Sequence, residues 1–351
     1  MKLQREARAQ WSLGALSLLV ATLLIASVGV GPMALSMADS LQVVVARLAG
    51  IELSVPAHVV TIVESIRIPR ALLGMLVGAA LAVSGAAIQG VFRNPLADPT
   101  LIGVSGGAAF AAVGSIVLGG TLLKPLHDLL GVYTLPVVAF AGGLISTLIV
   151  ARIATSRFGT SVTTMLLAGI AINIVTQAGI GVFSYMADDA MLRELTFWQM
   201  GSLGGATWDN LLAVATMIIC ALVLILRFGK ALNAFLLGES EARHLGVKVD
   251  RVKLQIIVLS ALAVGASVSV SGIIGFVGLV VPHIVRMSLG PDHRHLLPAS
   301  ALLGALFLLV ADMLSRTLIA PAELPIGLIT AIIGGPFFIG LILMQAKKGG
   351  L

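Results

Sequence analysis

Few residues in this sequence have the types and spacing that chemistry requires. The pattern Gly-x-x-x-x-Gly-Lys-Ser/Thr does not occur, so the chain has no phosphate-binding loop for ATP, and no His-Glu-x-x-His or Gly-x-Ser-x-Gly motif is present. The single cysteine, Cys220, lies in an apolar run and excludes a disulfide scaffold or a cysteine-built metal site. The sequence therefore predicts no catalytic residue, no bound metal or cofactor, and no enzyme.

Ionisable residues are nearly absent from the middle of the apolar runs. The polar side chains found there are Gln89, Asn173 and Gln177, whereas ion-driven carriers usually place Asp, Glu or His near mid-membrane. Asp312 and Arg316 are four residues apart near the end of one run, so they can pair on one helix face. We therefore expect any energy for uphill transport to come from outside this chain.

The elements that position these residues follow from composition. Of the 351 residues, 58% are apolar and 11% are charged, and the mean hydropathy is +1.07. Soluble domains carry about 25% charged residues, and disordered chains need low hydrophobicity and high charge, so both classes are excluded. The net charge is +6, but the basic residues form no stripe with interleaved aromatics, which argues against nucleic-acid binding. A polytopic membrane protein remains.

Apolar runs long enough to cross a bilayer recur along the chain, because a hydrocarbon core of about 30 Å needs about 20 apolar residues per helix. We predict ten helical spans: Trp11–Gly31, Ile68–Val91, Thr100–Gly119, Tyr133–Ala154, Val162–Ser184, Trp208–Arg227, Arg251–Ser271, Ile273–Leu289, Pro298–Ile319 and Ile326–Gln345. The seventh and eighth could form one broken segment, which would give nine. The first resembles a signal peptide, but its length exceeds the usual apolar stretch of about 7–15 residues, so we interpret it as a retained helix.

Basic residues favour cytoplasmic loops. With ten spans and the N-terminus inside, all but six of the 22 Lys and Arg residues fall on the inner side. The sequence therefore predicts that both termini are cytoplasmic. The six outer basic residues are Arg47, Arg67, Arg70, Lys124, Arg193 and Arg316.

Two further features concern packing and docking. Many of the 39 glycines lie inside spans, as at Gly78 and Gly278, and small residues let helix backbones approach closely in lipid. The long inner insertion between the sixth and seventh spans holds a Glu/Ala/Arg stretch between Gly238 and Gly246, typical of a short amphipathic helix. Composition alone leaves a solvated connector and a docking helix for a cytoplasmic partner equally open.

Several motifs together resemble one family. They are Ile66-Arg67-Ile68-Pro69-Arg70, the small-residue stretch 78–89, Arg93-Asn94-Pro95-Leu96-Ala97-Asp98-Pro99, Leu167-Ala168-Gly169, Leu237-Gly238-Glu239, the stretch 275–283 and Ala322-Glu323-Leu324-Pro325-Ile326-Gly327. This set is similar to the signature of the FecCD-type permeases, the membrane subunits of ATP-driven importers for iron-siderophores, heme and cobalamin. The resemblance covers essentially the whole chain.

The resemblance implies an all-α polytopic membrane protein in which residues 1–351 form one transmembrane permease domain of ten helices. It implies a two-fold homodimer in the lipid of the bacterial inner membrane, with a central translocation path. Two cytoplasmic ATPase subunits would use ATP and Mg²⁺, and a periplasmic binding protein would deliver the substrate. Alternating access would then be driven by the partners.

The family also implies roles for particular residues. Arg67, Arg70 and Arg316 match positions that dock the binding protein; lipid-headgroup contacts or an internal pair with Asp312 are the alternatives. Coupling helices at about 235–247 would enter a cleft of the ATPase through Gly238, Glu239, Ser240, Glu241, Ala242, Leu245 and Gly246. The cytoplasmic gate maps to Asn94, Leu96, Val162 and Thr163, where Val162 is more apolar than the matching position of cobalamin permeases.

For the substrate, the stretch 187–206 most resembles heme permeases, so the prediction is a heme importer, with an iron-siderophore or cobalamin importer as the alternative. Phe183, Tyr185 and Met186 could line the path or pack against neighbouring helices. His283 is the histidine inside a span; it is structural or, since histidine is a natural heme ligand, a transient contact. An ion-coupled carrier and a scaffold without transport are the competing classes.

Overall fold

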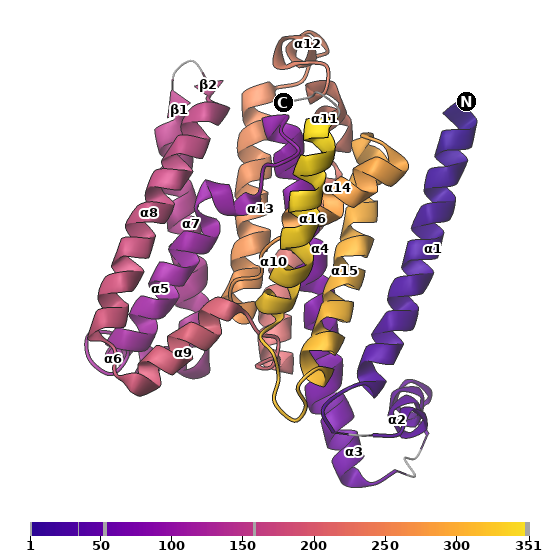
Figure 1. Cartoon of the computed structure of the whole chain (residues 1–351), viewed down its shortest axis with the longest axis vertical. Coiled ribbons are helices and arrows are strands. Elements are labelled where there is room, and N and C mark those ends of the chain that lie inside the picture. The colour runs from indigo at the N-terminus through magenta and orange to yellow at the C-terminus, as the bar shows by residue number, and fades with distance from the viewer. Residues whose placement is uncertain (1, 34, 52–54, 157–158, 348–351) are drawn as a thin grey trace.

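The computed structural model describes residues 2–33, 35–51, 55–156 and 159–347, and this part of the chain is a bundle of helices (Figure 1). The helices are α1 (Lys2–Gly29), α2 (Met37–Ala49), α3 (Ala57–Thr61), α4 (Ile68–Phe92), α5 (Val104–Leu118), α6 (Lys124–Leu130), α7 (Thr134–Ala154), α8 (Val162–Met186), α9 (Asp189–Met200), α10 (Trp208–Leu226), α11 (Gly229–Phe235), α12 (Glu239–His244), α13 (Val249–Ser271), α14 (Val277–Leu289), α15 (His293–Thr317) and α16 (Ile326–Lys347). A π-helical segment η1 (Ile62–Arg67) joins α3 to α4, and 3₁₀ turns η2 (Pro99–Ile102) and η3 (Gly131–Tyr133) precede α5 and α7. Two short antiparallel strands, β1 (Thr155–Ser156) and β2 (Gly159–Thr160), connect α7 to α8.

Each of the ten predicted spans coincides with an apolar helix. Within the described residues, seven helical segments are long and apolar enough to cross a bilayer, namely Glu6–Gly29, Ala57–Phe92, Lys124–Ala154, Val162–Met186, Trp208–Leu226, Val249–Ser271 and His293–Thr317. The other three predicted spans coincide with the shorter apolar helices Val104–Leu118, Val277–Leu289 and Ile326–Leu341. The seventh and eighth are separate helices, because Gly272 ends α13 with a positive φ of 65° and α14 begins after Phe276.

Helix α4 forms the centre of the bundle and packs against α10, α13, α14 and α15. Its backbone touches two neighbours: a Cβ on Gly78 would overlap the carbonyl group of Gly304 on α15, and one on Gly85 would overlap that of Gly278 on α14. Lipid supplies no hydrophobic force between helices, so close packing of small residues must hold them together. The close approach expected of the span glycines is confirmed at these positions.

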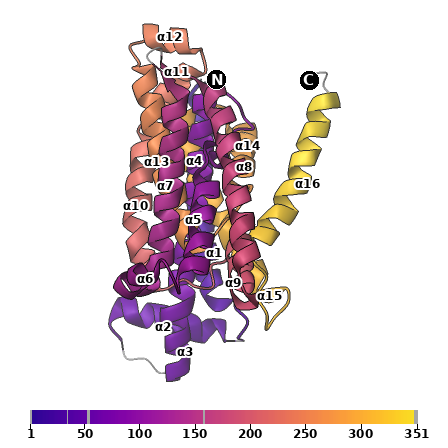
Figure 2. The ribbon, with the colours of Figure 1, turned by 90° about the vertical axis from the view of Figure 1, so that its left-hand side faces the viewer.

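The outer helices are packed more lightly. In the most apolar window of the α3–α4 segment 83% of residues are buried, against 22% in α8 and 17% in α1. Helix α8 rests on α5 and α7, and α16 diverges from the rest of the bundle toward its C-terminal end (Figure 2). A stable centre thus carries peripheral helices with uncovered apolar faces.

Hydropathy alone missed the elements at the end of the bundle opposite α12, where α2, α3, α6 and α9 lie (Figure 1). Helix α9 begins where the Asp188 carboxylate accepts hydrogen bonds from the backbone N–H groups of Ala190 and Met191, at 2.9 and 2.8 Å. The span predicted from Thr100 begins at Val104, because Asp98 caps a 3₁₀ turn at Thr100, 2.8 Å away. The next upstream span is longer than predicted and starts at Ala57.

The contact between α4 and α14 gives a direct test of this packing. We expect Gly85→Val to lower the thermal unfolding midpoint strongly or to prevent folding, because overpacking costs about 1–3 kcal/mol or more and this site faces backbone rather than a movable side chain. Gly14→Val is the matched control, since a Cβ on Gly14 meets nothing within 4 Å. Thermal unfolding in detergent measures both variants; equal midpoints would contradict the close backbone contact.

Candidate functional site

A buried charge cluster joins α4, α15 and the loop after α15 at the end opposite α12. The Arg70 guanidinium donates through Nε to Asp312 Oδ1 at 2.9 Å, and through Nη1 to both carboxylate oxygens of Glu323 at 2.9 and 2.8 Å. Arg316 Nη2 lies 3.0 Å from Asp312 Oδ2, an ion pair whose angles do not make a hydrogen bond. The predicted pairing of Asp312 with Arg316 is confirmed. Arg70, Asp312 and Arg316 are all buried, so their charges are compensated inside the protein rather than by water.

Arg316 of this cluster and the nearby Arg67 bind the end of α1 and the residues that follow it. Arg67 donates to the carbonyl oxygens of Val28, Gly29 and Met33 at 2.9, 2.8 and 2.6 Å. Arg316 donates to the Val30 carbonyl at 2.8 Å and to the Ser27 hydroxyl at 2.9 Å. The last four carbonyl groups of a helix have no partner within the helix, and they carry partial negative charge. Guanidinium groups therefore take the place that water would take at an exposed helix end.

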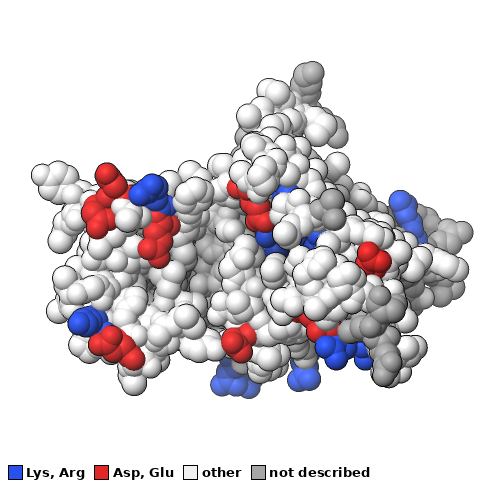
Figure 3. Space-filling model, turned by 90° about the horizontal axis from the view of Figure 1, so that it is seen from below, with Lys and Arg blue, Asp and Glu red and all other residues white. Residues whose placement is uncertain are grey.

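These positions bear on the predicted docking residues. The side chains of Arg67, Arg70 and Arg316 are 2–4% exposed and use internal acceptors, so a partner's carboxylate can reach them only if those acceptors are exchanged. Docking stays a prediction. Seen from this end, the surface is mostly uncharged, with scattered acidic and basic side chains (Figure 3).

The predicted gate residues lie in loop 93–103 and at the start of α8, and the η2 turn of this loop packs against α8. Asn94 Oδ1 accepts the Leu96 N–H at 2.9 Å, and the Asn173 side chain of α8 donates to the Thr100 carbonyl at 3.2 Å. A Cβ on Gly169 of α8 would overlap the Leu101 carbonyl, so the loop lies directly on the helix. Leu96 and the first turn of α8, which holds Val162 and Thr163, are partly or fully exposed. Side chains with this exposure are available to meet a second copy.

The predicted path residues divide into two groups. Phe183 packs against Phe110, with ring centroids 5.4 Å apart, and fills the space beside Gly114. Tyr185 and Met186, in contrast, are 92% and 59% exposed at the end of α8. His283 is half-buried and meets the Phe337 ring of α16 edge-on, with centroids 6.1 Å apart. Packing thus accounts for Phe183, whereas Tyr185 and Met186 remain free to touch a cargo.

The predicted coupling segment, at about 235–247, follows the short helix α11 and contains α12; both helices lie beyond the ends of the spans (Figure 1). Glu239 forms a 2.6 Å ion pair with Lys253, a side chain of α13 that is only 2% exposed. Ala242 is buried beneath α12, while Leu237 and Leu245 are 65% and 64% exposed. The segment is therefore held to α13 on one side and presents apolar side chains on the other. Among its remaining predicted members, Ser240, Glu241 and Gly246 are exposed and Gly238 is buried.

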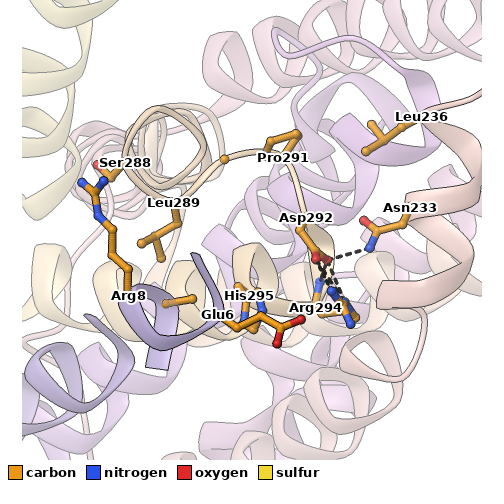
Figure 4. Close-up of a pocket in the computed structure, with 12 residues that line it drawn as sticks. Glu6, Arg8, Asn233, Leu236, Ser288, Leu289, Pro291, Asp292, Arg294 and His295 are labelled. Carbon is orange, nitrogen blue, oxygen red and sulfur yellow. Dashed lines mark hydrogen bonds and ion pairs between the residues drawn. The ribbon is translucent and has the colours of Figure 1, made fainter. Parts of the chain in front are cut away.

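A polar junction ties α11 to the loop before α15. Asn233 donates through Nδ2 to Asp292 Oδ1 at 2.6 Å, and its Oδ1 accepts the His293 N–H at 2.8 Å. Arg294 donates to the same Asp292 carboxylate at 2.6–3.1 Å (Figure 4). These bonds, those of Arg294 first, lower the pKa of Asp292 below its ordinary value. The carboxylate is charged and stays bonded to α11.

Sequence reasoning missed Asn233, Lys253, Asp292 and Glu323. Glu323 stands inside one of the motifs that carry the family resemblance, which was an available signal. Lys253 and Asn233 gave none, because nothing in their neighbourhood shows that they are buried. Across the described residues, no group of three His, Cys, Asp or Glu side chains is arranged to hold a metal ion.

Within the described residues, ten apolar helices, several of them packed on α4 at glycine contacts, define a permease-type membrane bundle, with α11 and α12 beyond their ends. The chain belongs to the FecCD transport family, whose model matches residues 18–344. It is 51% identical over 286 residues to the hemin transport system permease protein HmuU of Yersinia pestis, covering 81% of this chain and 84% of that protein. It is 42% identical over 298 residues to the cobalamin import system permease protein BtuC of Halobacterium salinarum, covering 85% and 78%.

A solved structure supports the fold. A protein described as a metal-chelate type ABC transporter, in an inward-facing conformation, aligns with a TM-score of 0.81 at 32% identity, covering 95% of this chain and 98% of that one. The resemblance to the FecCD-type permeases is therefore confirmed. Its relatives are permease subunits of ABC transporters, which are transport components rather than enzymes.

The buried charge cluster makes a quantitative prediction. We expect Asp312→Ala to destabilise the protein by about 3–5 kcal/mol, because it leaves Arg70 and Arg316 buried without their shared anion. The matched control is Glu64→Ala, which breaks the pair with Arg47, a side chain that is 64% exposed, and should cost far less because water screens exposed ion pairs. Unfolding by denaturant in detergent measures both. Equal losses would show that the cluster does not hold the helices together.

Proposed function

We propose that this chain is the permease subunit of an ATP-driven importer that moves heme from the periplasm to the cytoplasm of a bacterium. Two copies form the translocation path across the inner membrane, with α12 and both termini in the cytoplasm. Two ATPase subunits that use ATP and Mg²⁺ bind at α12, and a binding protein delivers heme at the opposite face. The identity of 51% with a hemin permease over most of both chains supports heme as the cargo.

The observation that carries the proposal is the pair of exposed leucines that flank α12. Leu237 and Leu245 are uncovered on a segment outside the spans, where they would face water in an isolated chain. Covering apolar side chains with a partner removes them from water, which favours association. This chain has no ATP-binding loop and no mid-membrane ion-coupling residues, so it has no energy source of its own. A partner that covers these leucines and hydrolyses ATP would supply that energy.

The path in this proposal runs along α8. Leu167 and Ile174 are 62% and 65% exposed, and Tyr185 ends the same helix at 92% exposure. An apolar helix face of this length suits either lipid or a flat apolar cargo such as a porphyrin, shared between two copies of the chain. Met186 lies beside Tyr185 at the outer mouth, and His283 makes at most a transient contact with the cargo.

The gate and the docking face complete the proposal. Asn94, Leu96, Val162 and Thr163 close the cytoplasmic end by meeting their counterparts across the two-fold axis. The binding protein docks on Arg67, Arg70 and Arg316, which release their internal acceptors and bind its carboxylates instead. A guanidinium group is suited to this because it can bind a carboxylate through two hydrogen bonds.

Uptake into proteoliposomes tests the function. With the partner ATPase and a heme-loaded binding protein, we expect ATP-dependent accumulation of heme. Ferric siderophore and cobalamin, each supplied with its own binding protein, should be taken up far more slowly. Preference for either of these cargoes would reassign the substrate. Uptake driven by an ion gradient without the ATPase would replace the proposal with a secondary carrier.

The Asn233 junction predicts a coupling variant. We expect Asn233→Ala to reduce heme uptake by about tenfold, since a hydrogen bond to a charged group is worth about 1.5–3 kcal/mol, while ATP hydrolysis by the assembled complex is retained. The reason is that α11 would move with the ATPase but no longer pull on Asp292. Asn210→Ala, at the other end of the bundle, is the control. A parallel fall in hydrolysis and uptake would indicate failed assembly instead.

A further inference from the structure

A cavity of about 650 Å³ opens at the α12 end of the bundle, where the first turns of α1 approach α11 and the α14–α15 loop (Figure 4). It is lined by Glu6, Arg8, Ala9, Asn233, Leu236, Ser288, Leu289, Gly290, Pro291, Asp292, Arg294 and His295. Asn233, Asp292 and Arg294 form the polar junction described above, but the cavity itself has no role in the proposed function. Its volume suits the headgroup of a phospholipid rather than a metal ion.

The cavity holds one cation and one anion that have no hydrogen-bonded partner among the described residues, although Glu6 lies close enough to Arg294 for a weak electrostatic interaction. Asp292 and Arg294 neutralise each other, with oxygen–nitrogen distances down to 2.6 Å. Within the part of the chain that the structure describes, Arg8 and Glu6 make no hydrogen bond or ion pair. Arg8 reaches toward Ser288 on one side of the cavity, and Glu6 lies toward Arg294 on the other (Figure 4). The free charges are thus of opposite sign and separated.

An apolar groove continues from the cavity between α1 and α14. It has a volume of about 370 Å³, shares Ser288 and Leu289 with the cavity, and is further lined by Ser12, Ala15, Leu16, Leu19, Ile284, Val285 and Leu303. Trp11, 80% exposed on α1, marks the level of the membrane interface, where tryptophan is enriched. The polar cavity at the membrane interface thus continues into an apolar groove at the depth of the acyl chains.

We propose that this cavity and groove bind one zwitterionic phospholipid with a primary ammonium group, as in phosphatidylethanolamine, from the leaflet on the α12 side. Arg8 binds the phosphate, Glu6 binds the ammonium, and the groove holds an acyl chain. Paired opposite charges favour a neutral headgroup over an anionic one, and N–H donors favour ethanolamine over choline. The lipid fills the space beside the lightly packed α1. The identification of this leaflet as the cytoplasmic one rests on the proposed function, whereas the lipid site itself does not.

Native mass spectrometry of the purified chain in micelles with equal amounts of phosphatidylethanolamine, phosphatidylglycerol and phosphatidylcholine tests the site. We expect one retained phosphatidylethanolamine per chain. Arg8→Gln should lower its retention about fivefold, as expected for loss of a charge-assisted contact. Glu6→Gln should shift the preference toward phosphatidylglycerol, because an unopposed arginine then faces the headgroup.

Arg152→Gln is the matched control, since Arg152 is an exposed arginine at the same end of the bundle, outside the cavity. Retention that is equal for the three lipids, or equal in Arg8→Gln and Arg152→Gln, would overturn the proposal and leave only non-selective boundary lipid. The measurement uses neither ATPase nor cargo. Its failure therefore leaves the importer proposal standing, and failed heme uptake leaves the lipid result standing.

Discussion

The structure depends on how charge is compensated at the end of the bundle opposite α12. Three guanidinium groups, on Arg67, Arg70 and Arg316, meet two carboxylates, on Asp312 and Glu323. The third cation is balanced by the partial negative charge of carbonyl groups at the end of α1. Because an unpaired charge in a low-dielectric interior is costly, this arrangement fixes α1, α4 and α15 relative to one another. Among the side chains that the structure describes at the opposite end of α1, none forms such a clamp, and there the helix borders the cavity and its groove.

Hydropathy and local spacing were sufficient to predict the helices and the contact between Asp312 and Arg316, because both are properties of a single segment. The partners of Arg70 were beyond such reasoning, since Asp312 is 242 residues away and Glu323 is 253 residues away. The partners of Arg67 are backbone carbonyl groups, which every residue has and no sequence pattern marks. The interfacial helices α2 and α9 were missed because their polar faces lower the mean hydropathy of any window that contains them.

The predicted coupling segment is attached to α13 at one point and is bounded by two glycines. The Glu239–Lys253 pair holds α12 to α13, while Gly238 and Gly246, with φ of 128° and 83°, bound it with conformations that side chains disfavour. Asn233 connects α11 to Asp292 at the start of α15. A displacement of α11 and α12 therefore acts on two long helices at once. Both pack on α4, which is too closely packed to deform, so the physically available response is a rotation of the subunit as a body.

The same close packing determines where a cargo can pass. Between α4 and its neighbours the backbones touch at Gly78 and Gly85, so the centre of the described bundle has no room for a porphyrin-sized molecule. Gln89, a polar side chain in this centre, is committed to structural bonds: it bridges Arg286 and the Gly278 carbonyl at 2.8 and 3.2 Å. In the proposed function the cargo passes along the outer surface of α8, which one subunit cannot enclose. A path along it requires a second wall, and the exposed residues at the start of α8 and in loop 93–103 are where a second copy would close it.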